Sequence, residues 1–282
     1  MRRRDIMSGE KKKKKETLII IPAYNESKNI EEVLHGLEGP EIAEFADVLV
    51  INDGSTDNTS EVVKVRQHHL VDHIFNLGYG SALQIGYKFA MRRNYKYVIQ
   101  MDADGQHDIS NVTNLYKALT TPDEDGRCPD IVLGARYMPG SPPFPTSAVK
   151  MLAIYLFRFA IRVVTGQKIH DPTTGLQGLS QSAFLYYSKF NHFDDQYPDA
   201  NMLIQMMILK FKVKEIPAVM HIRTDGTSMH SGLKPLWYMI RLSYEILSVI
   251  MRYKVLKLDA EIGNHDVVWD EKKNSDTETF DV

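Results

Sequence analysis

Short apolar runs alternate with helix-forming stretches along the first hundred residues, and each run stops at a cluster of polar residues. Four runs have the length and β-rich composition of buried strands: 17–21, 47–51, 72–75 and 97–100. Strands that alternate with helices predict an α/β fold with a Rossmann-like, doubly wound and mostly parallel sheet. Ligands of such sheets bind beyond the carboxyl ends of the strands, so the polar clusters mark the expected site.

The fourth run ends in an acidic pair. Asp102 and Asp104 lie where the strand is expected to leave the sheet, and local turning there can aim both carboxylates at one point. Together with the amide oxygen of Gln106 they offer the hard oxygen ligands that Mg²⁺ and Mn²⁺ favour, and Mg²⁺ commonly keeps substrate phosphates as further ligands. An Asp-x-Asp pair also occurs in ordinary turns. Its position at the same sheet edge as the other polar clusters favours the metal site.

Seven motifs between residues 17 and 230 follow one another in the order of a known family. They are Ile21-Pro22-Ala23-Tyr24-Asn25-Glu26, Asn52-Asp53-Gly54-Ser55-Thr56-Asp57, Asn76-x-Gly78-x-Gly80-x-Ala82, Asp102-Ala103-Asp104-Gly105-Gln106, Gly134-Ala135-Arg136-Tyr137, Asp171-Pro172-Thr173-Thr174-Gly175 and Arg223-x-x-Gly226-x-Ser228. In these motifs the chain resembles the family 2 inverting glycosyltransferases with the GT-A fold. It looks most like the polyprenyl-phosphate branch, which includes dolichyl-phosphate mannosyltransferases. It departs from the family pattern at Asn52-Asp53, where the family has an acidic pair, and at Leu176-Gln177, where an aromatic residue and an arginine are usual.

The resemblance implies a role for each motif residue on the donor side. Pro22, Tyr24, Glu26 and Asp53 would contact the base and ribose of a UDP- or GDP-sugar. The same residues have structural alternatives, since proline, glutamate and aspartate at these places can shape turns or open a helix. The glycines of the third motif, Gly78 and Gly80, and Gly86 beyond it are better explained by helix–sheet packing than by phosphate contact.

Metal and phosphate binding are implied in the same way. Asp102, Asp104 and Gln106 would hold Mg²⁺ or Mn²⁺ on the donor diphosphate. The cationic residues expected to face the acceptor phosphate are Arg136, Lys150 and Arg223, with Lys150 standing where the family often has an arginine. Catalysis would rest on Asp102, Asp104, Arg136 and Arg223. Guanidinium groups match phosphate geometry bidentately, although both arginines could also be solvated surface residues.

The acceptor decides whether a general base is needed. A lipid phosphate is already anionic near neutral pH, whereas a saccharide hydroxyl requires a carboxylate within hydrogen-bonding reach. Asp199 is the candidate base, with Asp194 and Asp195 as alternatives. An acid after Pro198 and ahead of an apolar run is better explained as a helix cap, so the phosphate acceptor is favoured.

Two apolar stretches near the carboxyl end favour a lipid. Residues 148–164 and 233–256 have the pattern of amphipathic helices with basic residues beside broad apolar faces. Each charge in mid-helix costs roughly 2.5–3.5 kcal/mol in a bilayer, and each Leu, Ile or Val returns about 0.3–0.6 kcal/mol. Arg241, Glu245 and Arg252 therefore exclude a span for the second stretch. An interfacial helix at a membrane surface is expected, with packing against a partner or a second copy as alternatives.

Composition and charge bear on the partners of the protein and on how the chain divides into segments. The formal net charge of −2 and a pI near 6.6 lack the basic surplus of a nucleic-acid-binding protein. We expect a basic disordered arm (1–16), a glycosyltransferase domain (17–230), a membrane-interface or partner helix (231–257) and an acidic disordered tail (258–282). No signal peptide is expected, which places the protein in the cytoplasm, peripheral on the cytosolic face of a membrane.

The sequence therefore predicts a metal-dependent inverting transferase that moves a sugar from a nucleotide donor to undecaprenyl or dolichyl phosphate. Transfer to a saccharide hydroxyl is the first alternative. A non-catalytic subunit that binds nucleotide sugars is the second.

Overall fold

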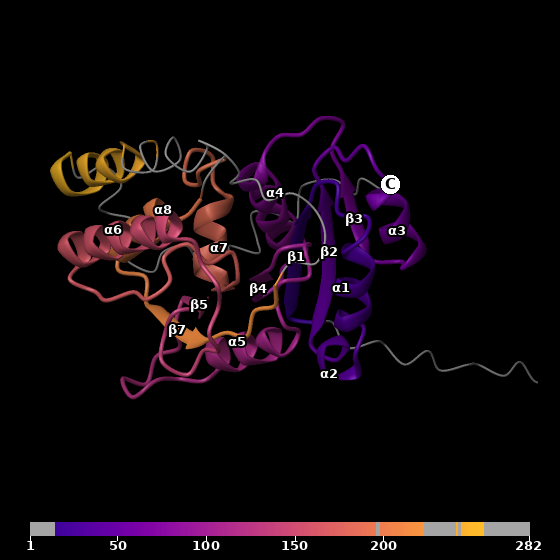
Figure 1. Ribbon diagram of the computed structural model, residues 1–282, viewed down its shortest axis with the longest axis horizontal. Helices are drawn as coiled ribbons and strands as arrows, with labels where there is room; N and C mark the ends of the chain where they lie inside the picture. Colours follow the sequence, from indigo (N-terminus) through magenta and orange to yellow (C-terminus); the bar gives the residue numbers. More distant parts are fainter. Residues whose placement is uncertain (1–14, 196–197, 223–240, 242–243, 257–282) are drawn as a thin grey trace, which may run out of the picture.

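The computed structural model describes residues 15–195, 198–222, 241 and 244–256 (Figure 1). Its strands are β1 (Thr17–Ala23), β2 (Ala46–Asn52), β3 (His69–Asp72), β4 (Tyr97–Gln100), β5 (Ile131–Ala135), β6 (Gln177–Ser180) and β7 (Val213–Pro217). Its helices are α1 (Ile30–Leu37), α2 (Pro40–Ala43), α3 (Thr59–Val65), α4 (Tyr79–Arg92), α5 (Ser110–Thr120), α6 (Ala148–Thr165), α7 (Gln181–Ser188) and α8 (Ala200–Ile208). Residues 244–250 are also helical and continue into a π-helical turn, Met251–Val255.

The strands form one sheet in the order β3-β2-β1-β4-β6-β5-β7. β1 is parallel to both of its neighbours, β2 and β4, and β6 is antiparallel to β4 and β5. The chain order reverses at β1, because β2 and β3 extend the sheet to one side and β4 to the other. Such a switch point is where the ligands of open α/β sheets bind, and it lies between the loops that follow β1 and β4.

Helices cover both faces of the sheet, as the alternation of side chains in β1 requires. Leu18 and Ile20 face a core built with α4, α6, α7 and α8, while Ile19 and Ile21 face α1, α3 and α5. All four side chains are fully buried, and each contributes about 1.5–3 kcal/mol relative to an exposed position. Gly86 of α4 lets the helix approach Ile20, since a Cβ there would lie 3.0 Å from its Cγ2. The packing role expected for Gly86 is therefore confirmed.

Two expectations about elements can be compared directly with the structure. The helix expected at 148–164 is α6, and its first turn is capped by Ser147 Oγ, which accepts from the backbone N–H of Lys150. The strand expected at 72–75 is wrong, because β3 covers His69–Asp72 and the following residues leave the sheet. Ile74 and Phe75 made the later window look like a strand, yet both side chains are largely exposed.

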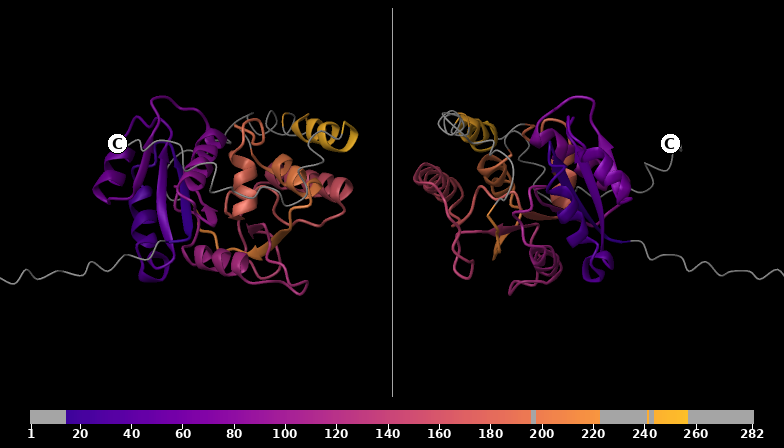
Figure 2. Two further views of the ribbon diagram at one scale, coloured as in Figure 1. Left: turned by 180° about the vertical axis from the view of Figure 1, so that it is seen from behind. Right: turned by 45° about the vertical axis from the view of Figure 1, so that its right-hand side comes forward.

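α6 and the helical segment 244–256 lie together at one end of the molecule, and α1 and α3 lie at the other (Figures 1 and 2). No helix within the described residues is long and apolar enough to cross a membrane. The expected helix 231–257 falls largely outside the described residues, as do the arm 1–14 and the tail beyond residue 257.

Candidate active site

The loops that follow β1 and β2 lock together at the carboxyl edge of the sheet. The backbone N–H of Asn25 donates to Ser55 Oγ (2.9 Å), and Asn25 Oδ1 accepts from the backbone N–H of Thr56 (2.8 Å). Asp57 accepts from the backbone N–H of Ser27 (3.1 Å). Asn25 has a positive φ of 55°, a conformation that asparagine tolerates better than most residues. The two motifs that were expected to bind the nucleotide thus form one structural unit.

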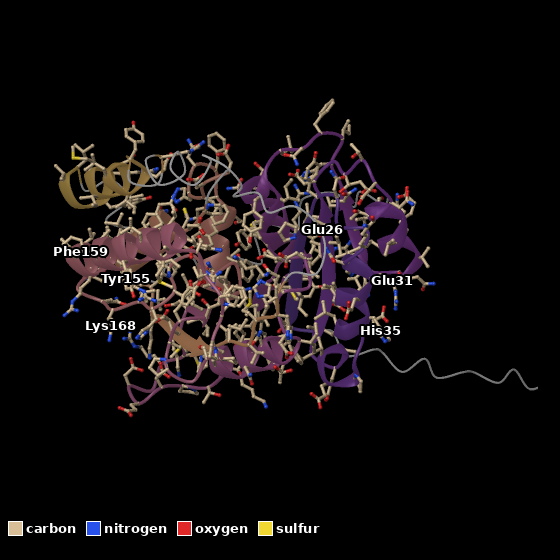
Figure 3. The ribbon with its side chains drawn as sticks, in the orientation of Figure 1. Glu26, Glu31, His35, Tyr155, Phe159 and Lys168 are labelled. Carbon is tan, nitrogen blue, oxygen red and sulfur yellow. The ribbon has the colours of Figure 1, made fainter. Side chains whose placement is uncertain are left out.

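The residues expected to contact the nucleotide sit in this unit with different exposure. Pro22 is buried in β1, and Tyr24 beyond it is 47% exposed. Glu26, labelled in Figure 3, accepts from Asn29 Nδ2 (2.7 Å) and donates its backbone N–H to Thr59 Oγ1 (3.0 Å). Their contact with a nucleotide stays a prediction.

Asp53 fastens the loop that follows β3. Its Oδ1 accepts from the backbone N–H of Leu77 (2.9 Å) and lies 2.7 Å from His73 Nδ1, and its Oδ2 accepts from the N–H of Gly78 (2.9 Å). The residue is 4% exposed. Asp53 therefore holds the segment that leads into α4, and its predicted nucleotide contact would have to use the remaining lone pairs of the same carboxylate.

Asp102 is held by two side chains from different parts of the fold. Its Oδ1 accepts from the hydroxyl of Tyr79 in the first turn of α4 (3.0 Å), and its Oδ2 lies 3.1 Å from His107 Nε2. Burial by itself raises the pKa of the Asp102 carboxyl, but the bonds to His107 and Tyr79 outweigh this effect and hold the pKa below its usual value. Asp102 is thus anionic near neutral pH. Gly175 packs against it, since a Cβ there would lie 2.8 Å from Asp102 Oδ2.

Asp104 and Gln106 form a tight turn beside Asp102. Asp104 Oδ1 accepts from the backbone N–H of Gln106 (3.1 Å), across Gly105, which has a φ of +74° and open space around it. The segment after β7 pins this turn: the backbone N–H of His221 donates to the carbonyl of Gln106 (2.7 Å), and Gln106 Nε2 donates to the carbonyl of His221 (3.2 Å). Since the amide nitrogen of Gln106 faces that carbonyl, its Oε1 is left for the predicted metal contact.

The donor set around Asp102 fits a Mg²⁺ or Mn²⁺ that shares its coordination with a substrate. Within the described ranges no cluster of three His, Cys, Asp or Glu side chains could cage a metal. Mg²⁺ does not need such a cage, because it commonly binds through one or two carboxylates, water and substrate phosphates. Asp102 and Asp104 would supply those carboxylates.

The amino end of α4 is covered by protein. The carbonyl of Asp195 accepts from the backbone N–H of Ser81 (3.0 Å), and a Cβ on Gly80 would lie 2.1 Å from the carbonyl oxygen of Asp194. Gly80 is therefore required for the approach of this loop, which favours the packing explanation over phosphate contact.

Arg136, at the end of β5, is committed to a buried ion pair. Its Nε and Nη2 donate to the two oxygens of Asp171 (2.7 and 2.8 Å), and Nη2 also donates to the carbonyl of Thr173 (3.0 Å). The Arg136 side chain is 9% exposed and that of Asp171 is fully buried. Burial disfavours the arginine charge, but the Asp171 carboxylate outweighs burial and raises the pKa of Arg136. A predicted phosphate contact would therefore use Nη1, which has no hydrogen-bond partner in the part of the chain that the structure describes.

Lys150 and Asp199 lie at the amino ends of two helices, α6 and α8. Lys150 is exposed, yet partial burial of its amine and the charge of Arg136 lower the pKa of this group. The carboxylates of Asp171 and Asp199 raise the same pKa but do not outweigh these effects. Asp199 occupies the N-cap position of α8 without a side-chain capping bond. Its charge also acts on the hydroxyl of Tyr79. Arg136, Asp199 and Asp102 thus lie within electrostatic reach of Lys150, whereas Arg223 lies outside the described residues.

Sequence reasoning missed three residues that shape this site: Tyr79, His107 and Asp171. Tyr79 lies between the glycines of the third motif, and His107 directly follows Gln106, so both were within sight of a motif. Asp171 belongs to a motif that carries the resemblance, but the resemblance implies no role for it. Neighbourhood to a motif was the only signal available, because each contact joins residues from separate elements.

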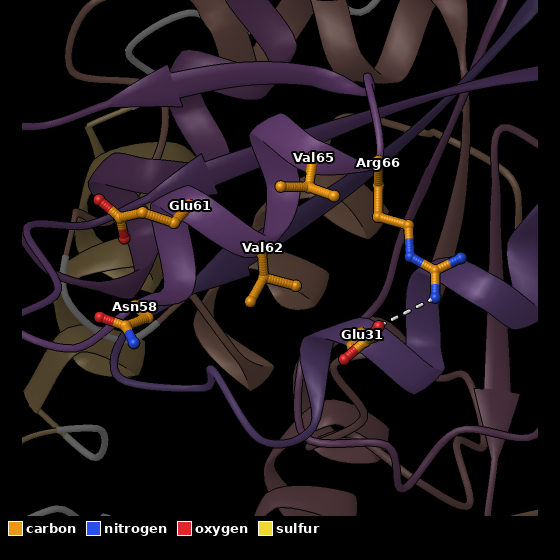
Figure 4. Close-up of a pocket in the computed structure, with 6 residues that line it drawn as sticks. All are labelled: Glu31, Asn58, Glu61, Val62, Val65 and Arg66. Carbon is orange, nitrogen blue, oxygen red and sulfur yellow. Dashed lines mark hydrogen bonds and ion pairs between the residues drawn. The ribbon is translucent and has the colours of Figure 1, made fainter.

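A hollow of about 250 Å³ lies between α1 and α3, away from these residues (Figure 4). Its lining is Glu31, Asn58, Glu61, Val62, Val65 and Arg66. Glu31 and Arg66 pair across it at 3.2 Å, and none of the predicted site residues that the structure describes lines it. It offers no convergent polar groups comparable with those around Asp102.

Comparison with known proteins identifies the family. The model of Glycosyl transferase family 2 matches residues 18–187, which is more than half of the chain. The chain belongs to glycosyl transferase family 2. The resemblance expected from the motifs is confirmed, and so is the assignment as a glycosyltransferase.

Individual relatives extend the likeness. An uncharacterised protein of Methanocaldococcus jannaschii is 30% identical over 234 residues, which cover 80% of this chain and 92% of that protein. A dolichyl-phosphate β-glucosyltransferase of Trichomonas vaginalis is 26% identical, covering 84% of this chain and 72% of its own.

The fold is shared with solved structures. Glucosyl-3-phosphoglycerate synthase from Mycobacterium tuberculosis, crystallised with Mn²⁺ and UDP-glucose, superimposes with a TM-score of 0.60 at 20% identity, over 83% of this chain and 79% of that one. The likeness confirms the expected GT-A fold with its mostly parallel sheet.

Proposed function

We propose that this family 2 glycosyltransferase moves a sugar, with inversion, from a UDP- or GDP-sugar to a polyprenyl phosphate at the cytosolic face of a membrane. The observation that carries the proposal is the amine of Lys150. The Lys150 amine makes no hydrogen bond or ion pair with the described residues, yet it lies close enough to Arg136 and Asp102 for their charges to act on its pKa. An anionic acceptor would give this amine a partner beside the loop that carries Asp102 and Asp104. The named dolichyl-phosphate relative supports the same acceptor class.

The chemistry follows from the charges that must be brought together. A divalent cation held by Asp102, Asp104 and Gln106 would stabilise the departing nucleoside diphosphate electrostatically. An acceptor phosphate oxygen, already anionic, would form the bond to the anomeric carbon as the bond to the diphosphate breaks. Lys150 and Nη1 of Arg136 would offset the repulsion between the two anions, and Arg223 is proposed for the same task. No general base is required.

Transfer to a saccharide hydroxyl remains the alternative because of Asp199. The charge of Asp199 acts on both Tyr79 and Lys150, so its carboxylate lies within electrostatic reach of the site. On a neutral acceptor, this carboxylate is the candidate base. The two acceptor classes differ in whether Asp199 is essential.

A transfer assay tests the proposal. Short-chain polyprenyl phosphate is incubated with a panel of UDP- and GDP-sugars and Mg²⁺ or Mn²⁺, with wild-type protein and with Asp104→Ala. We expect a chloroform-soluble, mild-acid-labile product that the variant does not form. Consumption of a donor only when oligosaccharide is added would contradict the phosphate acceptor and favour the alternative.

A membrane surface is proposed as the partner of α6. The outward side of α6 exposes a stripe of large apolar side chains: Val149, Leu152, Tyr155, Leu156, Phe159 and Val163. Tyr155 and Phe159 lie at the opposite end of the molecule from Glu31 and His35 (Figure 3). The neighbouring segment 244–256 exposes Tyr244, Leu247, Met251, Val255 and Leu256. Exposed Arg162 and Lys168 beside the stripe suit anionic headgroups.

Sedimentation with anionic vesicles tests this surface. We expect Phe159→Glu to weaken vesicle binding, whereas Val65→Glu, at an exposed apolar site on α3, should bind like the wild type. Unchanged binding by Phe159→Glu would contradict the membrane partner. A wild-type dimer that becomes a monomer in this variant would instead show that a second copy covers α6.

A further inference from the structure

His107 is a buried histidine whose side chain makes one hydrogen bond with the described residues. Its Nε2 lies 3.1 Å from Asp102 Oδ2, and its side chain is 2% exposed. The other ring nitrogen, Nδ1, is buried and has no hydrogen-bond partner among the residues described. Leaving a buried polar atom unpaired costs about 1–3 kcal/mol, so packing alone would favour an apolar side chain here. The bond to Asp102 is the compensating interaction.

The surroundings fix both the tautomer and the position of the ring. Because Nδ1 faces no acceptor in the described part of the chain, the tautomer with its proton on Nε2 is favoured, and it donates to the Asp102 carboxylate. The backbone of His107 forms an antiparallel bridge with Met220, so the ring projects from a main chain that is itself held in place. The donor therefore has little freedom to move away from Asp102.

The second oxygen of Asp102 is held from the opposite direction. The Tyr79 hydroxyl, in the first turn of α4, donates to Oδ1 at 3.0 Å. Gly175 lies on a third side, where an added Cβ would be 2.8 and 3.1 Å from the two carboxylate oxygens. These donors use one lone pair on each oxygen, and within the described ranges no other hydrogen bond reaches the carboxylate, which leaves the other lone pairs for a ligand.

We infer that His107 is a positioning residue, which fixes the Asp102 carboxylate in the orientation that binds a divalent cation together with the donor diphosphate. The inference rests on the proposed metal-dependent function. Mg²⁺ and Mn²⁺ favour near-octahedral oxygen sites, so a carboxylate that rotates freely binds them less well. Loss of a partner that orients a metal-ligating carboxylate typically weakens metal affinity about 10- to 100-fold.

Two substitutions separate the hydrogen bond from the packing. His107→Phe keeps a planar ring of similar size but has no donor. His107→Gln can place its Nε2 amide near the same carboxylate oxygen and retain the donor. His68→Gln is the matched control, because His68 Nε2 contacts the Glu38 carboxylate at 3.2 Å in a distant part of the fold.

The experiment measures Mn²⁺ binding to the full-length chain by electron paramagnetic resonance, in the presence of UDP and, separately, GDP. Thermal unfolding of each variant shows that it is folded. We expect His107→Phe to weaken Mn²⁺ binding about 10- to 100-fold. His107→Gln should recover most of the affinity, and His68→Gln should match the wild type.

Three results would overturn the inference. Wild-type affinity in a folded His107→Phe variant would show that Asp102 needs no such partner. Equal losses in His107→Phe and His107→Gln would assign the effect to packing instead of the donor. Failure of the wild-type protein to bind Mn²⁺ with either nucleotide would overturn the proposed metal-dependent function as well. The first two results would overturn only the role of His107.

Discussion

Removal of the Asp171 carboxylate should be among the most destabilising changes at this site. Asp171 is fully buried and accepts from Nε, Nη2 and the backbone N–H of Arg136 at 2.7, 2.8 and 2.9 Å. Asp171→Ala leaves the Arg136 guanidinium buried, charged and without its counter-ion. Breaking one partner of such a pair costs about 3–5 kcal/mol. For a domain of this size each kcal/mol lowers Tm by roughly 2–4 °C, so a fall of roughly 6–20 °C is expected.

Differential scanning calorimetry and urea unfolding measure this loss, and two further variants test its cause. Glu16→Ala breaks an exposed pair with Lys96 (2.6 Å, side chains 48% and 58% exposed), and such a pair contributes at most about 1 kcal/mol. Adding Arg136→Met to Asp171→Ala removes the unpaired charge and should restore part of the stability. A loss for Asp171→Ala no larger than that for Glu16→Ala would refute the reasoning, as would a double variant less stable than the single one.

Three other predictions concern the loops around the site. Gly80→Ala should lower the free energy of unfolding, measured in urea, by about 1–3 kcal/mol, because the new Cβ would clash with the carbonyl of Asp194. The clash should outweigh the higher helix propensity of alanine. A variant more stable than the wild type would contradict the close approach of the two segments. The pKa of Asp57 is lowered because hydrogen bonds from Thr59 and Ser27 outweigh burial, so the stability that Asp57 contributes is complete above about pH 4 and is lost as pH falls through the lowered pKa. Asp57→Ala should therefore lose less stability than the wild type as pH falls below about 4. The same dependence of unfolding free energy on pH in both proteins would contradict this role of Asp57. Asp199→Asn should reduce transfer to polyprenyl phosphate less than about ten-fold, against the 10²–10⁴-fold expected of a general base.

Elements with a strong local pattern could be predicted from the sequence. The first, second and fourth strands and α6 were recognised because their apolar spacing alone indicates burial, and their polar ends marked the edge where Asp53 and Asp102 lie. The third strand was misplaced by three residues. Ile74 and Phe75 fit a strand by composition, but the bonds of Asp53 to the segment that ends at Gly78 draw this part of the chain out of the sheet.

Contacts between distant residues could not be predicted from local pattern. Arg136 was expected to face phosphate, and only the fold reveals that two of its nitrogens bind Asp171, 35 residues away. The bond from His107 to Asp102 likewise depends on how the loop after β4 turns, and that turn is held by the backbone of residues 220–221. The antiparallel strand β6 between β4 and β5 was also invisible, because sheet order depends on long-range pairing.

The acceptor group is the central claim, and a comparison of two acceptors tests it most directly. Purified protein is given the same nucleotide sugar and Mn²⁺ with either a short-chain polyprenyl phosphate or the corresponding polyprenol, and sugar incorporation into lipid is measured for each. The account predicts a labelled product from the phosphate and none from the alcohol, with the yield reduced by Lys150→Ala. Labelling of the polyprenol, or transfer only to an added oligosaccharide, would contradict it.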